Sequence, residues 1–182
     1  MGNTFDWKTQ LVVGSRGEEL ILANYHEPLV IYPENKADFR RLSDRKLVEL
    51  KSDSYNLSKT EFMFFERFSD ITEKTAKKAG GPWRARRDRV GVFVYYFARH
   101  NTYYNFEDVK GLCARLDKLT KKQGLIAIKN RAWITGGYKV RRDLVEDLAT
   151  IHVFDAVNHV NKVLTPDMAK CYIESGLLIG LD

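Results

Sequence analysis

The sequence predicts an α/β fold in which a mixed central β-sheet is flanked by helices. Two runs, 62–68 (FMFFERF) and 90–97 (VGVFVYYF), are dense in aromatic and β-branched residues and have the length of strands in the middle of a sheet. Residues 106–122 carry apolar side chains at helical spacing, and Gly124 follows as an expected helix end. Together, these two kinds of segment indicate the α/β class.

The other elements are expected in a definite order along the chain. Ser15 and Glu18 have the spacing of a capping box, which predicts that a helix begins near residue 15. The expected elements are a helix over about 15–26, strands over 29–32, 36–42, 45–53 and 125–134, a turn at Gly136-Gly137, and a helix that starts within 143–151.

Length and composition favour one domain with a short extension. A chain of 182 residues that is 44% hydrophobic can bury one core. We expect the domain over 1–150, and a C-terminal extension over 151–182 that docks on it or forms a homodimer interface. The sequence shows neither a membrane-spanning run nor a secretion signal, which predicts a soluble, intracellular protein. Cys113 and Cys171 are expected to be small buried hydrophobic residues rather than disulfide or zinc ligands.

The charge of the chain is compatible with a polyanionic partner. The net charge is +6 and the isoelectric point is near 9.2, and clustered basic side chains displace the counterions condensed on nucleic acid. The basic segment 71–89 surrounds a glycine pair and a tryptophan, which either stacks on an unpaired base or fills the core. The candidate nucleic-acid-binding residues are Lys77, Lys78, Trp83, Arg84, Arg86 and Arg87.

The two strands of a predicted β-hairpin carry Asp38, Glu49 and Lys51. A two-residue loop at Ser43-Asp44 would set Asp38 directly opposite Glu49, whereas a four-residue loop would set Asp38 opposite Lys51. In either register, all three side chains share one face, because strand side chains alternate with period two. Opposed carboxylates repel each other, so the face needs positive charge from Lys51 and a divalent cation. The alternative interpretation is a solvated polar face on an edge hairpin.

Several motifs together resemble those of the PD-(D/E)XK nuclease superfamily, which includes restriction enzymes, phage recombination exonucleases and resolvases of branched DNA. The segments GSRGEEL, ADF and VELKSD occur in the superfamily's order, and TEFMFFERFSD, AGGPWRA and VFVYYF resemble phage and bacterial members. The resemblance covers residues 12 to about 142. It implies a restriction-endonuclease-like fold, hydrolysis of DNA, and Mg²⁺ or Mn²⁺ as cofactor.

The resemblance also implies roles for individual residues. Asp38 and Glu49 become metal ligands, Lys51 the catalytic lysine, and Glu18 or Glu19 the helix glutamate that assists at the metal. A purely structural role as the third residue of a capping box remains open for Glu18. The sequence departs from the superfamily pattern in two places: Ala37 replaces proline, and Phe62 replaces an expected asparagine.

Two further carboxylates have open roles. Glu66, on an aromatic strand, is either functional or at the end of the sheet. Asp53 continues the face of Glu49 and Lys51, and it either binds a second metal or ends the strand.

The resulting expectation is a metal-dependent DNA endonuclease of phage or bacterial recombination or repair, with branched DNA among its candidate substrates. It would act in the bacterial cytoplasm, or in the host cytoplasm if phage-encoded. The alternatives are a type II restriction endonuclease, a non-catalytic basic nucleic-acid-binding module and an RNA nuclease.

Overall fold

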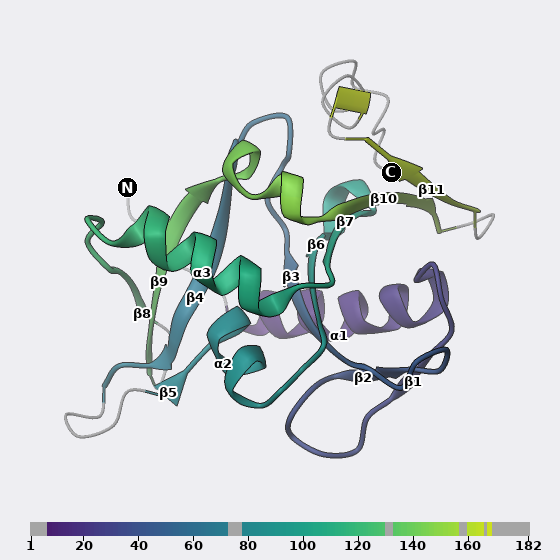
Figure 1. Ribbon diagram of the computed structural model, residues 1–182, viewed down its shortest axis with the longest axis horizontal. Coiled ribbons are helices and arrows are strands. Elements are labelled where there is room, and N and C mark those ends of the chain that lie inside the picture. The colour runs from purple at the N-terminus through teal and green to yellow at the C-terminus, as the bar shows by residue number, and fades with distance from the viewer. Residues whose placement is uncertain (1–6, 73–77, 130–132, 157–159, 166, 169–182) are drawn as a thin grey trace.

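The structure is a computed structural model that describes residues 7–72, 78–129, 133–156, 160–165 and 167–168. These residues form a mixed α/β fold with two β-sheets and three α-helices (Figure 1). The larger sheet has the strand order β1-β2-β3-β6-β7-β10-β11, and the smaller sheet has the order β5-β4-β9-β8. The α/β class predicted from the sequence is therefore confirmed.

The elements have the following bounds. The helices are α1 (Trp7–Asn24), α2 (Gly81–Arg87) and α3 (Val109–Thr120). The larger sheet contains β1 (Leu29–Ile31), β2 (Phe39–Arg41), β3 (Leu47–Asp53), β6 (Val92–Phe97), β7 (Thr102–Phe106), β10 (Thr150–Asp155) and β11 (Val160–Leu164). The smaller sheet contains β4 (Phe62–Asp70), β5 (Lys78–Ala79), β8 (Ile126–Lys129) and β9 (Ile134–Arg141).

Strand β6 lies in the middle of the larger sheet. It runs parallel to β3 and antiparallel to β7, which makes the sheet mixed. All six of its residues are buried, because helices or the second sheet cover both faces. This explains why the run 90–97 is almost entirely apolar rather than alternating.

The two faces of the larger sheet pack against different elements. Val92, Val94 and Tyr96 join Ile21 of α1 in one hydrophobic cluster. Phe93, Tyr95 and Phe97 join residues of α2, α3 and the smaller sheet in a second cluster. Figure 1 shows the same arrangement, with α1 across one face and α2 and α3 on the other.

A close approach fixes α1 on β3. A Cβ atom on Gly17 would collide with the side chain of Ser52, so only glycine allows the helix to lie this near the strand. Glu18 and Glu19 follow directly in α1. The position of these two carboxylates relative to β3 therefore depends on the absence of a side chain at residue 17.

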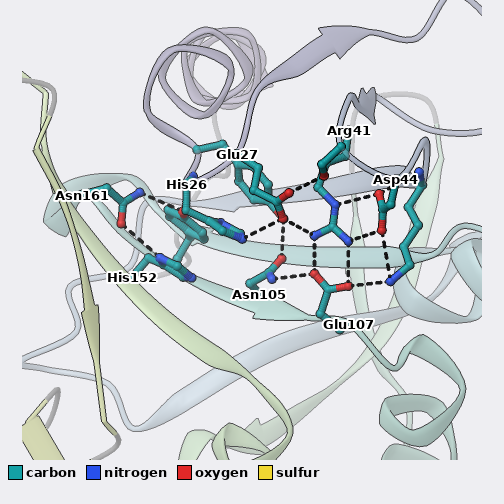
Figure 2. A network of polar contacts seen from close by, with 12 residues as sticks. His26, Glu27, Arg41, Asp44, Asn105, Glu107, His152 and Asn161 are labelled. Atoms are coloured by element: carbon teal, nitrogen blue, oxygen red, sulfur yellow. Dashed lines mark hydrogen bonds and ion pairs between the residues drawn. The ribbon is translucent and has the colours of Figure 1, made fainter.

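The hairpin of β2 and β3 is anchored at its tip by a buried arginine. The Arg41 guanidinium donates to both carboxylate oxygens of Asp44, at 3.0 and 2.7 Å, and to both of Glu107, at 2.5 and 3.0 Å. It also pairs with Glu27 at 3.0 Å. These contacts join the hairpin to the end of α1 and to the residue after β7 (Figure 2). The network lies on the face of the sheet that α1 covers.

The start of the first helix differs from the prediction. Helix α1 begins at Trp7, not near residue 15, so Ser15 lies inside it and forms no capping box. The sequence signal failed because the residues before Ser15, WKTQLVVG, are themselves compatible with a helix. The capping explanation of Glu18 is therefore removed.

The segment after residue 134 also differs from the prediction. Gly136 and Gly137 pair with β4 inside strand β9 and form no turn. A Cβ on Gly137 would lie 2.6 Å from the Phe65 carbonyl oxygen, so these glycines serve close strand packing. Residues 143–151 form no α-helix. They form short 3₁₀ turns over Arg142–Leu144 and Glu146–Leu148, and then the start of β10.

The expected C-terminal extension contributes to the main sheet as far as it is described. Strand β10 pairs with β7 and β11 pairs with β10, and Ile151 and Leu164 are buried in the core. The expected boundary between 150 and 151 thus falls inside β10. Residues 169–182, with Cys171, lie outside the described part of the chain, whereas Cys113 is buried as expected. In the described portion, no helix is long and apolar enough to cross a membrane.

Candidate active site

Asp38 and Glu49 meet at the base of the β2–β3 hairpin. The pairs Phe39↔Val48 and Arg40↔Leu47 have the register that a two-residue loop predicts, and the next pair outward in that register is Asp38 and Glu49. The loop is longer than expected, because β2 ends at Arg41 and β3 begins at Leu47. The Asp38 carboxylate also accepts a hydrogen bond of 2.7 Å from the Leu50 amide of β3, which holds it against that strand.

The two carboxylates form an electrostatically strained pair. Burial raises the pKa of Asp38 above its usual range, although the Leu50 amide and Arg84 oppose the rise. Burial and the neighbouring Asp38 raise the pKa of Glu49 to about 8, with Arg84 again opposing. Two acids that lie close together in a poorly solvated place favour a proton or a bound cation between them. The pair therefore lies in a poorly solvated place and is not a solvated polar face.

Lys51 lies on the same face of β3 as Glu49. Its Nζ atom donates to the Ser52 carbonyl at 3.2 Å, and its charge lowers the pKa of Glu66, which burial raises. The charge of Lys51 therefore acts on Glu66 of strand β4, in the smaller sheet.

Glu18 is an exposed glutamate of α1 whose carboxylate lies in the electrostatic field of Asp38. Burial, then Asp38, then Glu19 raise the pKa of Glu18. Glu18 lies inside α1 and caps no helix end, and its carboxylate adds to the negative charge around Asp38. The role of Glu18 or Glu19 as the glutamate that assists at a metal stays a prediction.

The structure adds Glu66 to the site. A glycine pair brings α2 onto the strand that carries this residue: Gly81 has φ +44°, and a Cβ on Gly80 would collide with the Glu66 side chain and lie 2.9 Å from the Ser69 amide nitrogen. Any larger residue at either position would force α2 away from Glu66. The glycine pair in the basic segment is the sequence signal that could have indicated this contact.

Arg84 of α2 reaches the acid pair from the other side. Its Nη1 atom lies 3.6 Å from Glu49 Oε1, its Nε atom lies 3.7 Å from Asp88 Oδ2, and its Nη2 atom donates to the Asn35 carbonyl at 2.5 Å. The sequence predicted that Arg84 contacts phosphate. In the structure it lies against the candidate metal ligands, because helix α2, which the sequence analysis missed, turns it inward.

The other candidate nucleic-acid-binding residues have mixed positions. Trp83 is 2% exposed, and its indole nitrogen donates to Asp117 at 2.8 Å. A buried indole offers no face for a base, which corrects the assignment of Trp83 to nucleic-acid binding and confirms its alternative role in the core. Lys78, Arg86 and Arg87 are exposed, whereas Lys77 lies outside the described residues.

Asp53 is held by a tyrosine rather than pointing into the acid pair. The buried Tyr95 hydroxyl of β6 donates to Asp53 and accepts a hydrogen bond of 2.9 Å from the Phe64 amide. This single hydroxyl thus ties β3, β6 and β4 together behind the site. The structure gives Asp53 a structural role at the end of β3.

Removing that hydroxyl should loosen the junction of the two sheets. Tyr95→Phe leaves a buried carboxylate and a buried amide each short of one partner, so we expect a loss of about 2 kcal/mol in unfolding free energy, measured by urea denaturation. The matched control is Tyr104→Phe on β7, because the buried hydroxyl of Tyr104 makes no hydrogen bond of normal geometry with any described residue. Equal losses in the two variants would contradict this role of Tyr95.

The acid pair fits a magnesium or manganese ion by its donor chemistry. Mg²⁺ is commonly bound through one or two carboxylates, with water and substrate phosphate completing its shell. Within the described ranges, no three His, Cys, Asp or Glu side chains are grouped as a self-sufficient metal site. Asp38 and Glu49 would hold the ion as a pair, and the Arg84 guanidinium shows that a cation is already favoured beside Glu49.

The comparisons with known proteins bear on neither fold family nor function. The chain matched no protein-family model, no curated protein and no solved structure. The arrangement of Glu18, Asp38, Glu49 and Lys51, with Glu66 and Arg84 added by the structure, therefore stands on the residues and their geometry.

Proposed function

We propose that this protein is a metal-dependent deoxyribonuclease of the PD-(D/E)XK type, with a restriction-endonuclease-like fold and Mg²⁺ or Mn²⁺ as its cofactor. The observation that carries the proposal is the pair of the partly buried Asp38 and the buried Glu49 on a β-hairpin, with Lys51 on the same face. Burying these charged groups costs folding free energy, which a purely structural role does not explain. In phosphodiester hydrolysis the same groups bind a metal ion and assist the reaction.

The order of elements also supports the family assignment. A helix that bears Glu18 precedes the hairpin, and further strands and helices follow around a mixed sheet. This is the order that the sequence resemblance implies. The DNA substrate rests on that resemblance and on the basic character of the chain, as do the roles in phage or bacterial recombination or repair.

Each residue of the site has a chemical task in this proposal. Asp38 and Glu49 hold the ion, which supplies Lewis acidity at a phosphate oxygen and a lowered pKa at a bound water. Lys51 Nζ orients the attacking water or stabilises charge that develops on the phosphate. Glu18 adds negative charge next to Asp38 and orients water at the edge of the site.

The test is a cleavage assay on several nucleic acids. Linear, nicked, single-stranded and four-way-junction DNA, and a matched RNA, are incubated with the protein in Mg²⁺, Mn²⁺ or EDTA. We expect cleavage of at least one DNA in either metal and none in EDTA. Discrete bands from a long duplex would indicate a restriction endonuclease. Salt-sensitive binding without cleavage in any metal would contradict the nuclease proposal and favour a non-catalytic binding module.

A further inference from the structure

Arg84 is a cationic side chain that acts on three carboxylates of the candidate site. It lowers the pKa values of Asp38, Glu49 and Glu66, each of which burial raises. Lys51 also lowers the pKa of Glu66. Geometry agrees, because the guanidinium lies 3.6 Å from Glu49 and belongs to a helix that packs against the strand of Glu66. In the protein without metal, Arg84 therefore supplies positive charge where the ion would bind.

The contact between Arg84 and Glu49 is loose enough to be exchanged. The Arg84 guanidinium lies more than 3.5 Å from both Glu49 and Asp88, too far for a hydrogen bond to either carboxylate. Its hydrogen bond goes to the Asn35 carbonyl instead. The arginine side chain is 34% exposed and that of Glu49 is 11% exposed. Because the pair is long and its arginine is partly in solvent, we expect it to contribute about 1 kcal/mol. A divalent ion, bound directly by carboxylate oxygens, would displace the guanidinium at little cost.

Asp88 offers Arg84 a second place after displacement. It already lies 3.7 Å from Arg84 Nε, one helical turn further along, and it is itself held by Arg87 at 2.7 Å. After displacement, the guanidinium would lie between Asp88 and the bound ion. In that position it would be next to a phosphate group that binds the ion. Its planar fork matches two phosphate oxygens.

We propose that Arg84 occupies the cation position beside Glu49 in the metal-free protein, yields it to the divalent ion, and then binds a phosphate oxygen of the substrate. This inference rests on the proposed function, because it needs a metal site and a phosphodiester. It makes Arg84 a competitor of the metal and a contact of the substrate. The two roles predict opposite effects of one substitution.

The chain provides a matched control for that substitution. Arg86 lies in the same helix, is 39% exposed, and forms an ion pair of the same length, 3.6 Å, with Asp117 instead of the acid pair. Arg84→Met and Arg86→Met therefore remove the same chemical group from one helix, with and without contact to Glu49. Arg84→Lys keeps the charge and gives up the planar fork, and it serves if Arg84→Met does not fold.

Ion binding is measured first, by titration calorimetry with Mn²⁺ and no nucleic acid. Arg84→Met should bind Mn²⁺ about fivefold more tightly than the wild type, the factor that corresponds to loss of a competing pair of about 1 kcal/mol. Arg86→Met should match the wild type, and Arg84→Lys should lie between them. Affinity in Arg84→Met no higher than in Arg86→Met would overturn the inference.

DNA binding is measured second, by fluorescence anisotropy with and without Ca²⁺ as a probe ion. The ion should strengthen DNA binding by the wild type several-fold more than by Arg84→Met, because only the wild type gains the freed guanidinium. An equal gain in both proteins contradicts the substrate contact. A wild-type protein that neither binds Mn²⁺ nor cleaves DNA would defeat the proposed function itself. If the wild type binds Mn²⁺ and cleaves DNA, but Arg84→Met changes neither the Mn²⁺ affinity nor the gain in DNA binding with Ca²⁺, this inference alone fails.

Discussion

Glu49→Gln should lower metal-dependent DNA cleavage about a hundredfold to a thousandfold, the size of effect that follows loss of one electrostatic contact to the transition state in other enzymes. The substitution keeps the shape of the side chain and removes the negative charge that pairs with Asp38 around the ion. We also expect Mn²⁺ binding to weaken strongly, because the amide is a poorer ligand than a carboxylate. Single-turnover cleavage and titration calorimetry measure the two effects.

The same variant should be more stable than the wild type in EDTA, which separates loss of function from loss of structure. Burial and Asp38 raise the pKa of Glu49 from 4.5 to about 8. A group whose pKa is raised on folding stabilises the fold below the unfolded value, and that stability is lost as the pH rises through the folded value. Glutamine does not ionise, so Glu49→Gln should melt at a higher temperature than the wild type at pH 8. A lower melting temperature there would contradict this account of the acid pair.

Lys51→Met is the companion variant for the chemical step. It removes the ammonium group and keeps the length of the side chain, while Asp38 and Glu49 remain. We therefore expect cleavage to fall as in Glu49→Gln but Mn²⁺ binding to persist. Loss of binding in both variants would assign Lys51 to the structure of the site instead.

Arg41→Ala should destabilise the fold by about 3 kcal/mol, the lower end of the cost of breaking a buried charge network. Arg41 is 4% exposed and lies among Glu27, Asp44 and Glu107. Without it, these three carboxylates repel one another, and the tip of the hairpin loses its attachment to β7. The control is Arg40→Ala on the same strand, whose exposed guanidinium lies over the Tyr32 ring. We expect that change to cost at most about 1 kcal/mol.

The effect of Arg41→Ala should depend on pH in a definite direction. Burial alone would raise the pKa of Glu107, but hydrogen bonds from Arg41, Lys46 and Asn105 outweigh it and lower the pKa from 4.5 to about 2. A carboxylate with a depressed pKa stabilises the fold above its unfolded value, and this stability is lost as the pH falls through the folded value. The difference between wild type and Arg41→Ala should therefore shrink between pH 4.5 and pH 2 in urea denaturation. A constant difference would place the stabilisation elsewhere.

The hairpin could be predicted from the sequence because residues close together in the chain determine it. The alternation of side chains fixes which residues share a face, so the facing of Asp38 and Glu49 tolerated a connection longer than the predicted two residues. The strands in 62–68 and 90–97 were predictable because their composition favours strands. Burial on both faces holds for Val92–Phe97, whereas in β4 only Met63, Phe64 and Phe65 are buried.

The errors lie where distant contacts decide the local structure. Gly136 and Gly137 resemble a turn in sequence, yet close packing against β4 places them in a strand. Leu144 and Leu148 have helical spacing, yet pairing of Thr150 and Ile151 with β7 ends that segment as a strand. The approach of Glu66 and Arg84 to the acid pair depends on how α2 docks on β4. No short-range pattern encodes that contact beyond the glycine pair that permits it.

The occupancy of the acid pair by a metal ion is the claim on which the proposed function rests. Crystals of the wild-type protein soaked in Mn²⁺ test it by anomalous diffraction at the manganese edge. The account predicts a strong anomalous peak bonded to carboxylate oxygens of both Asp38 and Glu49, with the Arg84 guanidinium turned away from Glu49. Saturated crystals in which both carboxylates carry no ion, and Arg84 still pairs with Glu49, would contradict it.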